Sequence, residues 1–250
     1  MGLKGLIVGI ANESSIAWGC AKVLHEAGAE LALTYQNEKA RKYVQPLAEK
    51  VKAPIVMPLD VSNDEETTAL FETIRKQWGK LDFLIHSIAF APKSDLQGRV
   101  VDCSKEGFLL AMDISCHSLI RLSKAVEPLM SHGGSIITMS YYGSEKVIKN
   151  YNLMGPVKAA LEATVRYLAI DLGQEKIRIN AISPGPIMTR AASGLEHFDQ
   201  LMEKAAKEAP LNQLVTIESV GEMAAFLVSD KAAHITGQVL YVDGGYNICG

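Results

Sequence analysis

The chain has 250 residues, of which 48% are hydrophobic and 21% charged, and its formal net charge is −3. This length suits one large α/β domain, and the slightly acidic balance argues against a protein that binds nucleic acid through its charge. No apolar run approaches the ~18 residues of a membrane-spanning helix, the start lacks a signal-peptide pattern, and the four scattered cysteines show neither disulfide nor metal-ligand spacing. We therefore expect a cytoplasmic protein with no membrane partner and no metal site.

Short apolar runs alternate with amphipathic segments along the whole chain. Most of the apolar runs are continuous, as in strands that are buried on both faces. The alternation predicts one domain, 1–250, built as a doubly wound parallel α/β sheet of about seven strands with helices on both faces; two half-domains are the alternative. The predicted strands are 5–8, 30–34, 55–59, 83–87, 135–140, 177–183 and 239–242, and the predicted helices are 16–27, 64–78, 109–130, 157–172 and 218–228.

The first predicted strand runs into a loop of small residues that starts at Gly9, and the next helix begins near Ile16. Small residues let the backbone approach a phosphate, and the N–H groups at the helix start can bind it. Ser14 or Ser15 can cap this helix and also touch the phosphate. Because the loop lacks G-x-G-x-x-G, it fits an ordinary turn equally well when it is taken alone.

Small or polar residues also follow the carboxyl ends of later strands, where ligands bind in open α/β sheets. Gln36 follows the second strand and can hydrogen-bond a ribose. Its neutral side chain favours NADH, while Lys39 and Arg41 leave NADPH as an alternative. The further candidates for cofactor contact are Asp60, Val61, Ser87, Ile88, Ala89, Ile187 and Thr189.

Six residues separate Tyr151 from Lys158. Proline is tolerated in the first turn of a helix, so Pro156 predicts that the helix begins only a few residues earlier, with Tyr151 at or just before its start. A phenol can donate a hydrogen bond to an oxyanion, and an ammonium group can assist it and hold a ribose. The pair indicates hydride transfer to a carbon conjugated to a carbonyl, although an isolated pair of this kind is more often a packed aromatic and a solvated lysine.

These motifs resemble the short-chain dehydrogenase/reductase family, and more closely its divergent branch of bacterial enoyl-[acyl-carrier-protein] reductases. Common members of the family have Tyr-x3-Lys, but here Met154 stands four residues before Lys158 and cannot donate a proton. The usual asparagine is also absent, because the matching region ends in Ser115. Both departures favour the branch over a ketoreductase. The resemblance rests on residues 9–12, 15–17, 34–37, 86–89, 113–115, 140–141, 150–155, 178–183, 185–187 and 242–245.

The resemblance implies a Rossmann-type fold and reduction by NADH of the C2=C3 double bond of trans-2-enoyl thioesters, carried by acyl carrier protein during fatty acid elongation. It implies that Tyr151 binds the enolate oxygen, that Lys158 binds the nicotinamide ribose, and that Tyr141 is a second catalytic tyrosine on the substrate side. It also implies a homotetramer and a substrate lid at 189–208. The substrate-binding candidates are Ala91, Tyr141, Met154 and Phe198.

Two other functions stay open at this point. A carbonyl reductase or alcohol dehydrogenase on the same fold is disfavoured by Met154 and Ser115. A nucleotide-sensing protein that has lost activity is disfavoured by the intact pair of Tyr151 and Lys158.

Overall fold

The computed structural model describes residues 2–190, 192–195 and 198–249. Within this part of the chain, seven strands form one parallel sheet in the order β3-β2-β1-β4-β5-β6-β7. The strand order reverses between β1 and β4, and such a reversal opens a crevice at the carboxyl edge of an α/β sheet. The prediction of a doubly wound, Rossmann-type sheet is confirmed. The strands are β1 (Lys4–Val8), β2 (Glu30–Tyr35), β3 (Ile55–Pro58), β4 (Phe83–His86), β5 (Gly134–Met139), β6 (Ile177–Pro184) and β7 (Val239–Val242).

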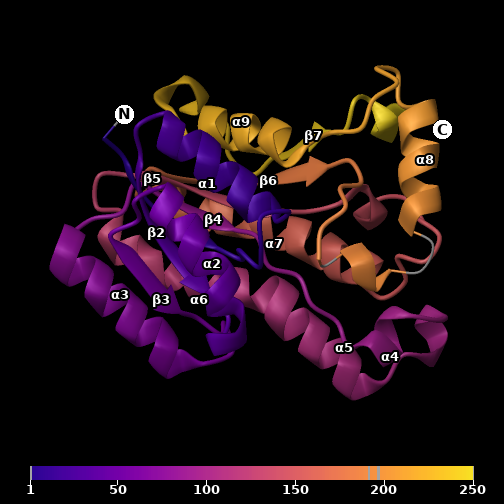
Figure 1. The fold of residues 1–250 in the computed structure, drawn as a ribbon, viewed down its shortest axis with the longest axis horizontal. Helices are drawn as coiled ribbons and strands as arrows, with labels where there is room; N and C mark the ends of the chain where they lie inside the picture. Colours follow the sequence, from indigo (N-terminus) through magenta and orange to yellow (C-terminus); the bar gives the residue numbers. More distant parts are fainter. Residues whose placement is uncertain (1, 191, 196–197, 250) are drawn as a thin grey trace.

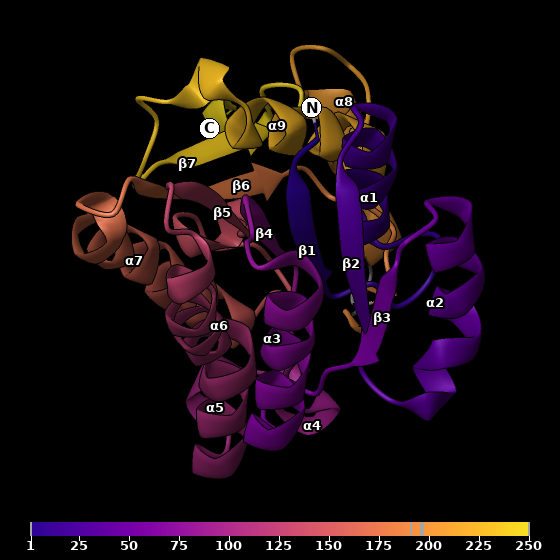
Figure 2. The ribbon, with the colours of Figure 1, turned by 90° about the vertical axis from the view of Figure 1, so that its left-hand side faces the viewer.

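Helices cover both faces of the sheet (Figures 1 and 2). One face packs against α1 (Ile16–Glu26), α2 (Glu38–Lys50) and α9 (Ile217–Val228), and this core includes Trp18, Val44 and Val220. The opposite face packs against α3 (Asp64–Trp78), α6 (Ser118–Val126) and α7 (Met154–Gly173), and this core includes Leu70, Leu122 and Leu161. Burial on both sides explains why the strands are apolar throughout rather than alternating.

The prediction of a single helix over 109–130 is wrong. The segment contains α5 (Lys105–Met112), a π-helical turn η2 (Asp113–His117), α6 and a final 3-10 turn η3 (Glu127–Leu129). A π-turn inserts one extra residue into an otherwise helical segment, so a continuous apolar pattern does not reveal it. Elsewhere the predicted and observed bounds agree closely, and α3 matches residue for residue.

The predicted elements omit α2, which begins after Asn37. The side chain of Asn37 accepts a hydrogen bond from the Ala40 N–H and so caps the helix. Pro46 lies inside α2 but is exposed, so water can bind the carbonyl that its missing N–H leaves free. Thr216 caps α9, in a reciprocal capping box with Ser219.

Two short helices lie beyond the carboxyl ends of the strands. They are α4 (Lys93–Leu96) and α8 (Phe198–Glu208), which sit at the end of the molecule toward which the arrows of β6 and β7 point (Figure 1). The described helices include none that is both long and apolar enough to cross a membrane. The sheet therefore directs its carboxyl edge toward the two helices that flank the predicted site.

Candidate active site

The segment before α7 presents Tyr151. Helix α7 begins at Met154, two residues before Pro156, so Tyr151 precedes the helix as predicted and Lys158 lies in its second turn. Asn150 and Asn152 flank Tyr151 with φ angles of +67° and +44°. Asparagine tolerates this left-handed conformation better than most residues do. These two residues, one on each side of Tyr151, give the chain a tight bend that sets the direction of the Tyr151 ring.

The rings of Tyr151 and Tyr141 lie edge to face, with centroids 4.7 Å apart and an interplanar angle of 62°. Gly143 provides the room for this contact, since a Cβ atom there would lie 2.4 Å from Cδ1 of Tyr151 and 3.2 Å from Cδ1 of Tyr141. The structure thus brings together the two tyrosines that the sequence singled out.

Both phenols stay protonated at neutral pH. Burial raises the pKa of Tyr141 well above its usual value, and burial, the neighbouring Tyr141 and Glu162 raise the pKa of Tyr151 further. Within the described residues the buried hydroxyl of Tyr141 has no hydrogen-bond partner. Since buried hydroxyls are nearly always paired, an unpaired one beside Tyr151 is a donor available to a ligand.

Lys158 is buried at the end of β5, with 4% of its surface exposed. Its Nζ donates a hydrogen bond of 2.6 Å to the carbonyl of Met139, the last residue of β5. Burial lowers the pKa of Lys158 to about 8, while the nearby Cys116 and Glu162 act in the opposite direction. A hydrogen bond to the strand end fixes the ammonium group at the carboxyl edge of the sheet.

A buried histidine joins β4 and β5 beneath this lysine. His86 is hydrogen-bonded through Nδ1 to Thr138 Oγ1 and through Nε2 to Ser118 Oγ, both at 2.8 Å. Ser118 donates its own proton to the carbonyl of Ile114 at 2.6 Å, so Nε2 carries the imidazole proton and Nδ1 accepts from Thr138. Burial and the charge of Lys158 lower the pKa of His86 to about 3, so the ring is neutral.

The π-turn places Ser115 against the segment that follows β4. Ser115 Oγ accepts from the N–H of Phe90 at 2.8 Å and donates to its carbonyl at 2.9 Å. Where common short-chain reductases place an asparagine, this chain therefore uses a buried serine that fixes a backbone segment. The sequence indicates only that Ser115 stands where an asparagine is usual. It does not reveal the contact with Phe90, because the two residues are 25 positions apart.

The loop after β1 fits a nucleotide phosphate. Gly9 has a φ of +111°, and a Cβ atom there would lie 2.0 Å from the carbonyl oxygen of Ser87, so only glycine allows the ends of β1 and β4 to meet. Of the two cap candidates, Ser14 and Ser15, Ser15 occupies the N-cap position of α1, but its side chain does not cap the helix, because its Oγ instead accepts from the N–H groups of Ala11 and Asn12 at 3.0 and 3.1 Å. The first N–H groups of α1 consequently lack a side-chain cap, as a bound phosphate requires.

The ribose end of the predicted crevice lies after β2 and β3. Gln36 is exposed directly after β2. Arg41 lies 5.7 Å over the ring of Tyr35 and 3.5 Å from the carboxylate of Glu38, so its charge is partly neutralised. Asp60 Oδ1 accepts from the N–H and hydroxyl of Ser62, at 2.9 and 2.6 Å.

The remaining cofactor candidates also follow strand ends. Val61 is buried after β3, Ser87 and Ile88 are partly buried after β4, and Ala89 is exposed. Ile187 and Thr189 follow β6, and Thr189 Oγ1 accepts from the N–H of Ala192 at 3.1 Å. All of these residues lie on the carboxyl side of the sheet, where the sequence placed them.

An apolar cluster lies around Tyr151. It contains Met154, Ala91 and Tyr151 together with Leu96 and Val157. Phe198, the fourth substrate candidate, is buried at the start of α8 but does not belong to this cluster. The structure therefore brings two of the predicted wall residues together beside Tyr151 and leaves Phe198 apart.

Hydrogen bonds that the sequence did not signal connect α4 and its C-cap Gln97 to the tyrosine segment and to the predicted lid. The Nδ2 of Asn152 donates to the carbonyl of Leu96 at 2.9 Å, and the Nε2 of Gln97 donates to the carbonyl of Gly194 at 3.3 Å. The second bond joins α4 to the predicted lid, of which residues 191, 196 and 197 lie outside the described residues. The segment after β4 therefore contacts both the tyrosine segment and the lid segment.

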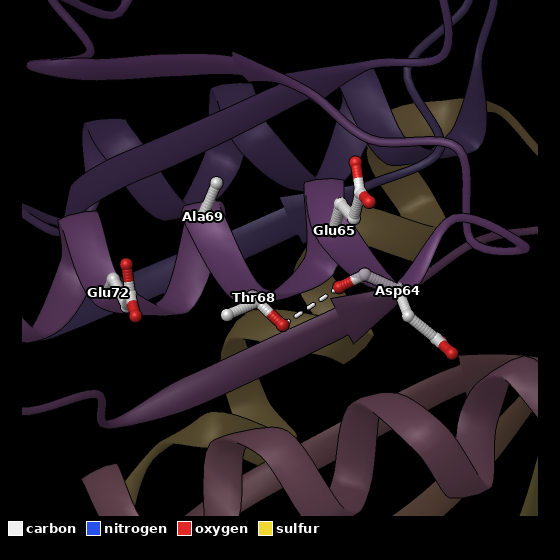
Figure 3. Close-up of a pocket in the computed structure, with 5 residues that line it drawn as sticks. All are labelled: Asp64, Glu65, Thr68, Ala69 and Glu72. Atoms are coloured by element: carbon white, nitrogen blue, oxygen red, sulfur yellow. Dashed lines mark hydrogen bonds between the residues drawn. The ribbon is translucent and has the colours of Figure 1, made fainter.

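A surface depression on α3 lies apart from these groups (Figure 3). Its lining residues are exposed, and Thr68 Oγ1 donates to the carbonyl of Asp64 within the helix at 2.8 Å. No described group of three or more His, Cys, Asp or Glu side chains is arranged to hold a metal ion, the acids here included. The depression is the outer face of a helix whose first turn is acidic. It is lined by Asp64, Glu65, Thr68, Ala69 and Glu72.

A doubly wound sheet with a buried lysine and a hydroxyl donor at its carboxyl edge is the arrangement of the nucleotide-dependent short-chain reductases. Comparison with known proteins narrows this class. The family model described as enoyl-(acyl carrier protein) reductase matches residues 9–247, and the chain belongs to that family.

Individual relatives cover the chain from end to end. The NADH-dependent enoyl-[acyl-carrier-protein] reductase FabI of Rickettsia felis is 51% identical over 249 residues, which are 100% of this chain and 96% of the relative. An enoyl-(acyl-carrier-protein) reductase of Anaplasma phagocytophilum, solved in complex with NAD, is 47% identical with a TM-score of 0.96, covering 100% of this chain and 95% of that one. The Bacillus cereus enoyl-acyl carrier protein reductase, solved with NADP+ and an indole naphthyridinone, is 47% identical with a TM-score of 0.98, covering 100% and 98%.

Proposed function

We propose that the protein reduces the C2=C3 double bond of trans-2-enoyl thioesters, with NADH as the reductant and acyl carrier protein as the carrier of the substrate. The pairing of Tyr151 with Tyr141 carries this proposal, because it puts two protonated phenols beside the apolar cluster of Met154 and Ala91. Met154 occupies the place of the tyrosine that ketone reductases use. The hydrogen-bond donor of this chain, Tyr151, therefore lies at a different position from the donor of a ketone reductase. Membership of the enoyl reductase family supports the same activity.

The cofactor fits the crevice at the carboxyl edge. The glycine at position 9 and the uncapped start of α1 would hold the pyrophosphate, while Gln36 would bind the adenine-side ribose and Asp60 and Val61 the adenine edge. Lys158, Ile187 and Thr189 would hold the nicotinamide end. When bound, NADH supplies the hydride that adds to C3 of the enoyl thioester.

The residues of the chain would control charge during that addition. Negative charge collects on the thioester oxygen, and the protonated Tyr151 would donate a hydrogen bond to it, as preorganised donors do for oxyanions. Lys158 is cationic below its pKa of about 8 and would add a positive field while it binds the ribose hydroxyls. The unpaired hydroxyl of Tyr141 would supply a second donor on the substrate side.

The direct test is the loss of NADH absorbance with a trans-2-enoyl thioester, run in parallel with NADPH and with a 3-ketoacyl thioester. We expect the cofactor to be consumed with the enoyl substrate and NADH, and neither with the ketoacyl substrate nor with NADPH. Consumption with only the ketoacyl substrate would establish the carbonyl reductase alternative. Binding of NADH without turnover of either substrate would favour a nucleotide-sensing role. Comparing enoyl-acyl carrier protein with the matching enoyl-CoA then tests the carrier.

We also propose a homotetramer in the cytoplasm. Large apolar side chains are exposed on α5 and α7, and further ones on α9 and near the C-terminus, and such side chains are available for self-association. All four cysteines are free thiols, as suits a reducing compartment. Sedimentation at micromolar concentration tests the assembly, and a dimer or monomer would refute it. The exposed side chains are Phe108, Leu109, Leu110, Tyr167, Ile170, Phe226 and Ile248.

The lid at 189–208 remains part of the proposal. The start of α8 carries the buried Phe198, and Ala205 and Ala209 anchor the end of the segment against Tyr142 and Tyr246. In this proposal the Phe198 end of the segment would close over an acyl chain while Ala205 and Ala209 hold the other end in place. Shortening Phe198 to alanine is expected to raise KM for long enoyl chains more than for a four-carbon chain.

A further inference from the structure

A buried carboxylate lies behind the tyrosine pair, and the proposed reaction does not use it. Glu162 stands one turn after Lys158 on α7 and is 5% exposed. Its Oε1 accepts hydrogen bonds from Ser140 and from Ser144, the second at 2.6 Å. Two hydroxyl donors on one oxygen suit the ionised form of the carboxyl group.

A buried carboxylate is costly unless an opposite charge compensates it. Residues four apart share one face of a helix, so Lys158 lies on the same side of α7 as Glu162. The charge of Glu162 raises the pKa of three neighbouring groups. They are Lys158 on α7, Tyr151 in the segment that precedes α7, and Tyr241 on β7. The phenols are neutral, and Arg166, four residues after Glu162, is exposed to water, so Lys158 is the buried cation on this face that can balance the carboxylate.

Other titratable groups face Lys158 from neighbouring elements. His86 on β4 is neutral and hydrogen-bonded at both nitrogens, and its positive form would oppose the lysine charge. Cys116 on η2 is buried, and a thiolate there would favour the lysine charge. Among these groups, Glu162 is the one whose side chain is a carboxylate with two hydroxyl donors on it.

The two hydrogen bonds of Glu162 also bracket Tyr141. Ser140 immediately precedes Tyr141, and Ser144 ends the 3-10 turn η4 (Tyr142–Ser144) that follows it. One carboxylate oxygen therefore ties both sides of Tyr141 to α7, the helix that carries Lys158. The same turn contains Gly143, which gives the two tyrosine rings their room.

We propose that Glu162 is a positioning residue: its buried carboxylate is the counter-charge that keeps Lys158 cationic, and its two hydrogen bonds fix the turn that presents Tyr141. Glu162 touches neither substrate nor cofactor in this role and acts through its neighbours. The catalytic part rests on the proposed function, and the electrostatic part does not.

The first test compares the pH dependence of kcat/KM in the wild type, Glu162→Gln and Ser144→Ala. Glutamine keeps the shape and an accepting oxygen but removes the charge. Burial already brings the pKa of Lys158 to about 8, so losing the carboxylate should move the alkaline limb toward lower pH by roughly one unit. Ser144→Ala removes one hydrogen bond and keeps the charge of Glu162. The alkaline limb of this variant should therefore stay at the wild-type pH, whatever the maximal rate of the variant. Equal limbs in wild type and Glu162→Gln, or an equal shift in Ser144→Ala, would overturn the proposal.

The second test needs no turnover and separates failure of this inference from failure of the proposed function. Lys158→Met leaves the carboxylate buried without its counter-charge, so its melting temperature should fall below that of the wild type. Adding Glu162→Gln to Lys158→Met should recover part of that loss, because both charges are then absent. A double variant that melts at or below the temperature of Lys158→Met refutes the pairing. The comparison remains decisive even if Glu162→Gln alone does not fold.

Discussion

Tyr141 and Tyr151 have the same side chain but different surroundings. Tyr151 is partly buried behind the bend made by Asn150 and Asn152, and Lys158 follows two turns later. Tyr141 is buried, and its hydroxyl has no partner among the described residues. An unpaired buried hydroxyl destabilises the unliganded protein, whereas a donor to an oxyanion lowers a barrier, so the two tyrosines should respond differently to loss of the hydroxyl.

Tyr151→Phe should lower kcat by about 10²-fold, because removing one preorganised oxyanion donor typically costs 10²–10³-fold. The ring contact with Tyr141 is kept, so NADH affinity should stay near that of the wild type. Steady-state kinetics and fluorescence titration with NADH measure the two quantities. Tyr43→Phe on the exposed side of α2 is the matched control and should leave both unchanged. A Tyr151→Phe enzyme with full kcat would remove this residue from the chemistry.

Tyr141→Phe should increase the free energy of unfolding of the unliganded protein by about 1 kcal/mol, since it removes a buried hydroxyl without a partner. The same change should lower kcat/KM if that hydroxyl meets the substrate. Urea denaturation and kinetics on one preparation check both. A destabilised variant would mean that the hydroxyl is satisfied in the folded protein, contrary to the structure.

The sequence predicted the tyrosine–lysine pair because spacing and Pro156 are local features. It could not predict the roles of Gly143, Ser115 or Asn152, whose partners lie on other elements. A glycine shows its purpose only when a ring from a distant residue occupies the place of its Cβ. The same limit applies to Ser15. A serine before a helix can accept from the first N–H groups of the helix or from those of the preceding loop, and the sequence does not distinguish the two.

At the scale of elements, the segment from β5 to α7 is arranged around two aromatic rings. Gly143→Ala would place a Cβ atom 2.4 Å from Cδ1 of Tyr151, so the ring must move. We expect activity to fall by at least tenfold, because a misplacement of about 1 Å can cost 10²-fold. Gly173→Ala at the end of α7 meets nothing within 4 Å and is the control. It should keep full activity and gain roughly 0.5–1 kcal/mol of stability from alanine's helix propensity.

The strands and most helices followed from local pattern, whereas three features of the helices did not. Helix α2 contains Pro46, and a proline inside a segment argues against a helix there. The sequence does not show that Pro46 is exposed, which is why the helix tolerates it. The π-turn carries Ser115, whose hydroxyl is hydrogen-bonded to the backbone of Phe90, 25 residues away along the chain. Helix α4 is a single turn, and its bonds to Asn152 and Gly194 are tertiary. Elements that tertiary contacts define have no periodic signal in the sequence.

At the scale of the whole molecule, the parallel sheet delivers residues from the ends of β1 to β6 to one edge. The two halves of the sheet meet where β4 pairs with β1 on one side and with β5 on the other. His86, the last residue of β4, spans this region from Thr138 on β5 to Ser118 on α6. The buried imidazole is therefore a cross-link beneath Lys158, and its protonation at Nδ1 would remove the acceptor that the Thr138 hydroxyl uses and place two positive charges together.

Acid should unfold the protein partly through this histidine. The pKa of His86 is about 3 in the folded protein and near 6.5 when the chain is unfolded, so the unfolded state binds more protons between these values. The stabilisation by neutral His86 is complete above pH 6.5 and is lost as pH falls toward 3, by up to about 1.4 kcal/mol per pH unit. Urea denaturation at pH 7, 6 and 5 should show His86→Asn destabilised most at pH 7, with the gap to the wild type closing as pH falls. A constant gap for His86→Asn across this pH range would mean that the imidazole is not held neutral by the fold.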